Sequence, residues 1–295
     1  MHDQADDATY LYSHLEPSDA RRIFPCLEQP DLKAVFHVRM TAPKKWQILS
    51  NQPEVERSEE GDLATVTFAP TPPLSTYLTS FAAGPYQYQQ RTWTAPDGSH
   101  SAQLRAFARA SMFEHLDEEI LELTAQGMDF FHQNFGYPYP WGKYDSIFVP
   151  EYNLGAMENP GLVTFTENYI FRSRATRAQH AGRANTILHE MSHMWFGDLV
   201  TMRWWEDLWL NESFAEWASH FAQEEIRAKY GDRSDPWATF CNSRKTWAYR
   251  QDQLPTTHPI VADIPDLEAA KLNFDGITYA KGASVLKQLV GFVGE

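Results

Sequence analysis

The sequence has few cysteines, fewer basic than acidic residues, and no long apolar run. Cys26 and Cys241 are the only cysteines among 295 residues, too few for a disulfide framework and typical of a reducing compartment. No apolar run approaches the ~20 residues that cross a bilayer. The first seven residues are polar and acidic, unlike a secretory signal. We therefore expect a cytoplasmic protein with no membrane partner.

The shortage of positive charge also restricts the partners. The chain has 25 Lys and Arg against 39 Asp and Glu, a formal net charge of −14. Nucleic-acid binding needs a basic patch, so no nucleic-acid partner is expected, whereas a cationic substrate would suit this field. The length and the 43% hydrophobic content provide for one large domain or two ordinary ones.

The pattern of the chain changes near residue 86. Before it, alternating residues at 33–40 and 63–68, punctuated by prolines at 70, 72 and 73, predict β-strands. After it, the apolar spacing predicts an amphipathic helix at 116–134, buried strands at 147–149 and 162–166, and a final helix from near Tyr279. We expect an α+β fold, with a β-rich domain over residues 1–86 and a mixed domain over residues 87–295.

Two more helices are predicted around a histidine pair. The first covers residues 183–195. The second begins at Asn211, a suitable N-cap, and ends near residue 230, with Gly231 as C-cap. His189 and His193 are four residues apart, so on a helix both imidazoles share one face and could bind one metal ion. The arginines at 172, 174, 177 and 183 are interpreted as a solvated loop.

The H-E-x-x-H pattern at 189–193 is typical of a zinc hydrolase, although two histidines at this spacing can also be ordinary helix residues. Glu190 is turned by about 100° from His189 and suits a base acting on the attacking water. A catalytic zinc takes three protein ligands, and Glu212, separated from His193 by eighteen residues, is the third candidate. An antiparallel second helix would return it to the histidines.

The neighbourhood of this site leaves several roles open. His180 and His220 lack the motif spacing and are interpreted as non-ligands. The segment between the two helices carries three tryptophans that could wall the site: Trp204, Trp205 and Trp209. Three nearby polar residues could orient the histidines, and the sequence does not choose between them: Asp198, Glu216 and Asn185.

Together these segments resemble the M1 family of zinc aminopeptidases, gluzincins related to thermolysin, and most of all its actinobacterial members. The matching segments are H-E-M-S-H at 189–193, W-L-N-E-S-F-A-E at 209–216, G-A-M-E-N at 155–159, T-Y-A-K-G-A at 278–283 and F-P-C-L-E-Q-P at 24–30. The resemblance covers nearly the whole chain. It implies a β-rich, saddle-like N-terminal domain followed by a thermolysin-like catalytic domain. It also implies a fragment, without part of the N-terminal domain and without a helical C-terminal domain that normally packs on the catalytic one.

The resemblance further implies an activity and a role for each site residue. The reaction is removal of the first residue from peptides with a free N-terminus, with one Zn²⁺ per chain. Its ligands would be His189, His193 and Glu212. Glu190 would be the general base, and Tyr279 would donate a hydrogen bond to the oxyanion. The substrate-binding residues would be Glu16, Gly155, Ala156, Met157, Glu158 and Asn159.

Within that set, the two carboxylates explain the preference for an N-terminus. Glu16 and Glu158 would pair with the substrate α-ammonium. The backbone of Gly155 and Ala156 would run beside the substrate like an added strand.

Two other functions remain open. A related bifunctional epoxide hydrolase uses the same zinc scaffold, but those relatives carry glutamine at the position of Glu16. A truncated fragment could instead bind zinc or a partner with little or no turnover. Intact Glu190 and Tyr279 favour the aminopeptidase.

Overall fold

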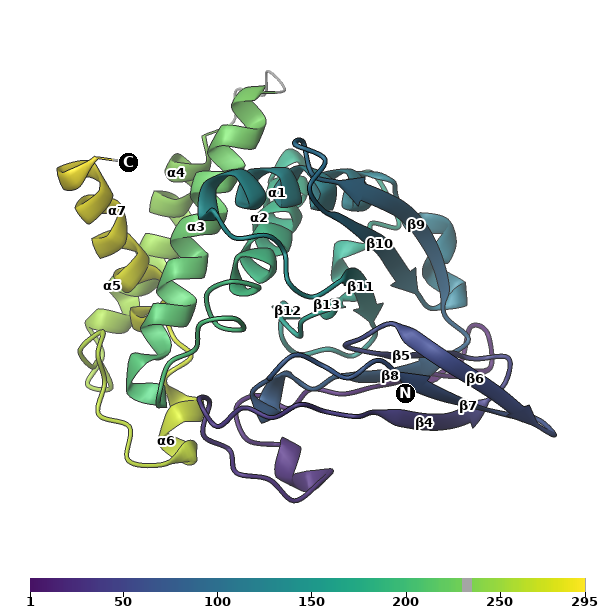
Figure 1. Ribbon diagram of the computed structural model, residues 1–295. Coiled ribbons are helices and arrows are strands. Elements are labelled where there is room, and N and C mark those ends of the chain that lie inside the picture. Colours follow the sequence, from purple (N-terminus) through teal and green to yellow (C-terminus); the bar gives the residue numbers. More distant parts are fainter. Residues whose placement is uncertain (230–234, 295) are drawn as a thin grey trace.

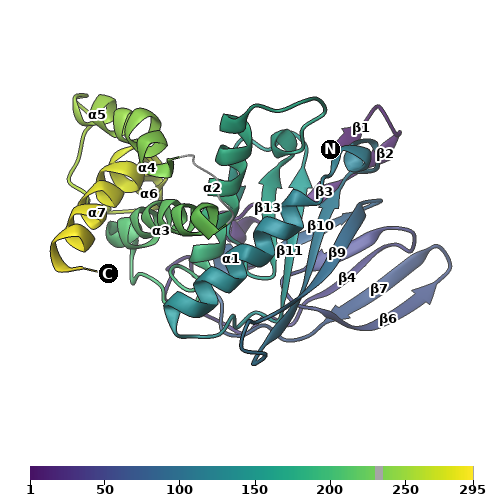
Figure 2. The same ribbon diagram turned by 90° about the horizontal axis from the view of Figure 1, so that it is seen from above.

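The computed structural model describes residues 1–229 and 235–294. Sheets form one end of the molecule and helices the other, with the N-terminus among the sheets and the C-terminus on an outer helix (Figures 1 and 2). The predicted α+β class is confirmed. No helix within these two stretches is both long enough and apolar enough to cross a membrane.

Residues 1–86 contain three small antiparallel sheets. The first pairs β1 (His2–Asp3) with β2 (Ala8–Thr9). The second has the order β3 (Leu11–Tyr12), β8 (Phe81–Gly84) and β5 (Gln47–Ser50), and the third has the order β4 (Arg39–Pro43), β7 (Leu63–Phe68) and β6 (Glu54–Glu60). β7 confirms the strand predicted at 63–68, because its alternate residues Ala64, Val66 and Phe68 are buried in one cluster with Ile48.

The strand predicted at 33–40 is wrong over most of its length. β4 begins only at Arg39, and before it Ala34 forms an isolated bridge with Leu74. The facing segment carries prolines at 70, 72 and 73, which lack the N–H group that a continuous ladder requires. Only separate backbone bonds remain, such as the one from Thr71 N–H to the Phe36 carbonyl.

A mixed five-stranded sheet supports the rest of the molecule. Its order is β12 (Ala156–Met157), β13 (Leu162–Thr166), β11 (Lys143–Val149), β10 (Ser101–Ala108) and β9 (Gln87–Thr94). β10, β11 and β13 are parallel, which confirms the strands predicted at 147–149 and 162–166. Every residue of β11 and β13 is buried, as expected for parallel strands covered on both faces. β12 lies at the edge of the sheet.

Three long helices pack beside this sheet: α1 (Glu119–Phe135), α2 (Arg177–His193) and α3 (Leu208–Lys229). α1 confirms the helix predicted at 116–134 and ends at Gly136, whose φ of 63° is left-handed. α2 begins six residues before the predicted start, because Thr176 and Gln179 form a capping box. The largest apolar cluster lies between these helices and the sheet.

The earlier start of α2 corrects the interpretation of the basic run. Arg183 lies inside the helix rather than in a solvated loop, and its side chain is 1% exposed. Its guanidinium forms ion pairs with Asp117 and Glu119. These pairs neutralise a charge that would otherwise be costly to bury.

The start of α3 was also predicted wrongly. A turn at Trp205–Asp207 leads directly into the helix at Leu208, so Asn211 lies in the first turn and is not an N-cap. The predicted end near residue 230 and the C-cap at Gly231 lie outside the described residues.

Short helices form the outer layer next to α3 (Figure 2). They are α4 (Pro236–Thr239), α5 (Thr246–Asp252), α6 (Leu267–Leu272) and α7 (Gly282–Val293), with π-type segments at Phe240–Lys245 and Ile277–Lys281. The final helix thus starts three residues after the predicted position, and Tyr279 lies in the segment before it.

Candidate metal centre and active site

Helices α2 and α3 run antiparallel, which brings the H-E-x-x-H motif to the first turn of α3. Asn185 of α2 bonds to Ser219, whereas Ala181, one turn earlier, accepts a bond from Gln223, farther along α3. Toward the C-terminal end of α2, His189 and His193 lie next to Glu212 in the first turns of α3. The second helix therefore runs back along the first, as predicted, and brings Glu212 to the two histidines.

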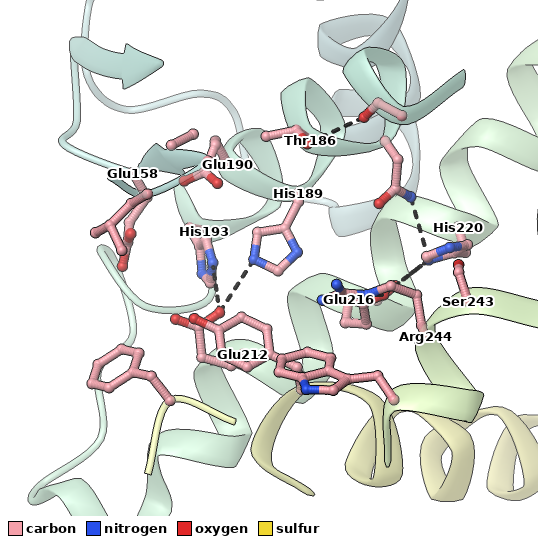
Figure 3. Close-up of a pocket in the computed structure, with 18 of the residues that line it drawn as sticks. Glu158, Thr186, His189, Glu190, His193, Glu212, Glu216, His220, Ser243 and Arg244 are labelled. Carbon is pink, nitrogen blue, oxygen red and sulfur yellow. Dashed lines mark hydrogen bonds and ion pairs between the residues drawn. The ribbon is translucent and has the colours of Figure 1, made fainter. Parts of the chain in front are cut away.

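The three candidate donors have distances that suit one metal ion. His189 Nε2 lies 3.2 Å and His193 Nε2 lies 3.5 Å from Glu212 Oε2 (Figure 3). Donors held 2.0–2.1 Å from a tetrahedral ion lie about 3.3 Å apart, so two nitrogens and one oxygen fit zinc here. The side chains of His193 and Glu212 are almost fully buried and that of His189 is 12% exposed, which leaves one open side.

Two hydrogen-bond acceptors orient the His193 ring through its Nδ1 atom. Its Nδ1 lies 2.7 Å from Asn211 Oδ1 and 3.1 Å from the Phe196 carbonyl. Because both partners accept, Nδ1 carries the proton and Nε2 presents its lone pair toward Glu212. This role of Asn211 was not predicted from the sequence. Its position directly before Glu212 on one helix was the available signal. In the described part of the chain, no bond to either histidine comes from the side chains considered earlier: Asp198, Glu216 and Asn185.

More carboxylates surround the donors. Glu158 and Glu190 lie within 4.8 Å of His193, and Glu16 and Glu158 lie within 4.8 Å of Glu212, measured between their ligand atoms. Burial and the neighbouring carboxylates raise the pKa of Glu16 and of Glu190 well above the ordinary range. Glu16 Oε1 is buried without a hydrogen-bond partner among the described residues. Such a cluster is costly unless a cation enters it.

Tyr279 approaches the donors from the segment before α7. Its ring is nearly parallel to that of His189, with centroids 6.0 Å apart and 17° between the planes. Burial and the charge of Glu212 keep the pKa of Tyr279 well above its ordinary value. The phenol therefore stays protonated and can donate a hydrogen bond.

A cavity of about 800 Å³ connects these groups. Of the G-A-M-E-N segment, Gly155, Ala156 and Glu158 line it. Asn159 is buried and does not line the cavity, and the Met157 side chain packs into a separate apolar cluster of the core. Among the described residues, only part of the expected substrate-binding segment therefore faces the cavity.

The tryptophans expected to wall the site do not line this cavity. Trp205 is buried against Tyr77 and Phe274, and Trp204 donates its indole N–H to the Ile264 carbonyl. Among the residues that the structure describes, the tryptophan that lines the cavity is Trp247 of α5. Its position results from tertiary packing, which the local sequence does not report.

Comparison with known proteins agrees with this architecture. The family model for the peptidase family M1 domain matches residues 119–295, and that for the peptidase M1 N-terminal domain matches residues 2–78. The chain belongs to peptidase family M1. This M1 chain is 53% identical to Aminopeptidase N of Streptomyces lividans, over 99% of the chain and 33% of that relative.

Two other relatives are more distant. The M1 chain is 35% identical to Probable aminopeptidase 2 of Sulfurisphaera tokodaii, over 98% of the chain and 36% of the relative. It is 36% identical to Tricorn protease-interacting factor F2 of Thermoplasma acidophilum, over 98% of the chain and 35% of the relative. The chain thus spans about a third of the length of these proteins. The division at residue 86 and the roles of the site residues remain predictions.

Proposed function

We propose that this chain carries a zinc aminopeptidase site, which hydrolyses the first peptide bond of substrates with a free N-terminus. The observation that carries the proposal is the pair Glu16 and Glu158 beside the three donors, with Glu16 Oε1 buried and without a hydrogen-bond partner among the residues that the structure describes. A substrate α-ammonium would supply the missing cation. It would also place the first peptide bond next to the donors, which favours removal of a single residue.

The catalytic roles follow from the positions of the side chains. His189, His193 and Glu212 would hold one Zn²⁺, which when bound polarises the scissile carbonyl and lowers the pKa of a coordinated water. Glu190 takes a proton from the attacking water and transfers it to the leaving amine. Tyr279 donates a hydrogen bond to the oxyanion that forms at the scissile carbonyl.

The substrate backbone is aligned by the edge of the mixed sheet. β12 offers its outer edge to an extended peptide, in the manner of strand addition. Gly155 and Ala156 line the cavity at this edge, next to Glu158. A peptide aligned here with its ammonium at Glu158 extends past the donors.

The ammonium pairing is tested by binding of a short peptide and of its N-acetyl analogue. We expect Glu158→Gln and Glu16→Gln to weaken binding of the free-amine peptide about 10- to 100-fold, as for loss of a hydrogen bond to a charged group. Binding of the N-acetyl peptide should change little. Glu151→Gln, at an exposed carboxylate in the loop before β12, is the control. Equal weakening of both peptides would contradict the proposal.

A further inference from the structure

The cavity continues past the metal donors, away from the ammonium-binding carboxylates. Figure 3 shows Glu158 on one side of the histidine pair and Glu216 with Arg244 on the other. Under the proposed function, the first residue lies between Glu158 and the donors. Because an extended residue spans only about 3.3–3.6 Å, the second residue of the peptide lies at this far end.

The far end is built around an ion pair. Arg244 donates from Nε and Nη2 to the two oxygens of Glu216, at 2.8 and 2.7 Å. The Glu216 side chain is 2% exposed and that of Arg244 is 35% exposed, so the pair leads from the interior to the cavity. Burial opposes the charged form of Glu216, but the charge and hydrogen bonds of Arg244 outweigh it and lower the pKa of Glu216. The pair is therefore ionised and rigid.

Arg244 packs in a row of aromatic side chains that extends toward the metal donors. Its guanidinium carbon lies 4.7 Å from the centre of the Trp247 ring, and the Trp247 and Tyr279 rings are 6.0 Å apart. Nη1, the remaining guanidinium nitrogen, makes no hydrogen bond to the residues that the structure describes. Two N–H donors are therefore available on a residue that lines the cavity.

We propose that Arg244 determines specificity for the second residue of the substrate, and that it favours side chains ending in an oxygen acceptor over apolar side chains of similar size. This inference rests on the proposed function. Asn185, His220 and Gln223 line the same end of the cavity and are already bonded to protein groups. An apolar side chain there would cover the Nη1 donors of Arg244 without offering them an acceptor. Because Glu216 already neutralises the guanidinium, the selected feature is the acceptor rather than negative charge. Glutamine should bind at least as well as glutamate.

The test compares two peptides that differ only at the second residue, Ala-Gln-Ala and Ala-Met-Ala. Binding is measured by calorimetry to zinc-loaded Glu190→Gln protein, which should not cleave them. We expect the glutamine peptide to bind about tenfold more tightly. In a Glu190→Gln background that also carries Arg244→Met and Glu216→Gln, the ratio should fall to about one. Glu216→Gln is included because removing Arg244 alone would leave the buried Glu216 carboxylate unpaired.

The control is Arg250→Met, at an exposed arginine of the neighbouring helix α5, which should keep the tenfold ratio. A purely structural loss would weaken both peptides alike and leave the ratio unchanged. Equal affinities in the parent protein, or a ratio that survives in the Arg244 variant, would overturn the inference even if wild type cleaves peptides. Failure of both peptides to bind would overturn this inference and the proposed function together.

Discussion

At the residue scale, Asn211 connects two functions of the site. Its Oδ1 accepts the Nδ1 proton of His193 at 2.7 Å, and its Nδ2 donates to Glu158 Oε1 at 3.4 Å. The backbone makes room for this amide at Gly197, where a Cβ would lie 2.2 Å from Asn211 Oδ1 and φ is +130°. One side chain therefore orients a metal donor and touches an ammonium-binding carboxylate.

We expect Asn211→Ala to weaken zinc affinity about 10- to 100-fold, because His193 loses the acceptor that fixes its tautomer and ring orientation. Competition with a chromophoric chelator measures this affinity. Asn242→Ala, at an exposed asparagine, is the control and should leave it unchanged. Unaltered zinc affinity in Asn211→Ala would show that the Phe196 carbonyl alone orients His193.

Residue roles could be predicted where local geometry determines them. The pairing of His189 with His193 follows from helical spacing, whereas Glu212 also required an antiparallel return of the chain. The role of Asn211 was missed because the start of α3 depends on how the turn at Trp205–Asp207 packs. Tyr279, one of thirteen tyrosines, was identified by family resemblance and not by spacing.

At the scale of elements, a close contact between α3 and α7 controls the position of Tyr279. A Cβ at Gly282 would lie 1.9 Å from Ser213 Oγ. Ser213 Oγ also donates to the Thr278 carbonyl at 2.5 Å. Ser213 follows Glu212 and Thr278 precedes Tyr279, so this contact fixes the distance between a metal donor and the proposed oxyanion donor.

Gly282→Ala should therefore lower the free energy of unfolding by about 1–3 kcal/mol, because the new methyl group forces the two helices apart. Urea unfolding gives this quantity. Gly291→Ala in the same helix is the matched comparison, since a Cβ there meets nothing within 4 Å. That variant should be neutral or more stable by up to about 1 kcal/mol. Equal effects of the two substitutions would exclude the contact as the cause.

Elements were predicted best where their own sequence determines them. β7 and β13 were located from alternation and from a buried apolar run. The segment 33–40 failed because its partner, and not the segment itself, carries the prolines. The early start of α2 could have been predicted, since the capping box of Thr176 and Gln179 is visible in the sequence.

At the scale of the whole molecule, the site depends on how the N-terminal sheets are attached to the mixed sheet. Glu16 follows β3 of the N-terminal sheets, whereas Glu158 follows β12 of the mixed sheet. Lys143 Nζ is buried and donates to the Ser50 carbonyl at 2.9 Å. Asn51 Nδ2 donates to the Pro160 carbonyl at 2.9 Å, just after the G-A-M-E-N segment. The first bond joins the end of β5 to the start of β11, and the second joins the residue after β5 to the residue after the substrate-binding segment.

A second attachment is sensitive to pH. Asp3 is paired with Arg109 at 2.5 Å and accepts a bond from Ser111. Burial opposes its ionisation, but these bonds, together with the Ala5 N–H, lower the pKa of Asp3 to about 2. A lowered carboxyl pKa stabilises the fold fully above the ordinary value of 3.8, and this stabilisation is lost as the pH falls toward 2.

We therefore expect Asp3→Asn to have a lower free energy of unfolding than wild type at pH 6. The difference should narrow as the pH falls from about 4 toward about 2. Urea unfolding across this range measures it, with Asp263→Asn at an exposed aspartate as control. A difference that does not change with pH would mean that Asp3 contributes through packing and not through its charge.

Glu190→Gln distinguishes a zinc site in which Glu190 is the base from one in which Glu190 is a ligand. Zinc content and release of the first residue from a peptide are measured for the variant and for wild type. We expect one Zn²⁺ per chain in both proteins and turnover in the variant reduced at least about 100-fold. Loss of zinc in the variant would indicate a metal held by Glu158, Glu190 and His193, whose ligand atoms also lie within 4.8 Å of one another. Three results would contradict the proposed zinc aminopeptidase site: this loss of zinc, undiminished turnover in the variant, or zinc-loaded wild type that releases no amino acid.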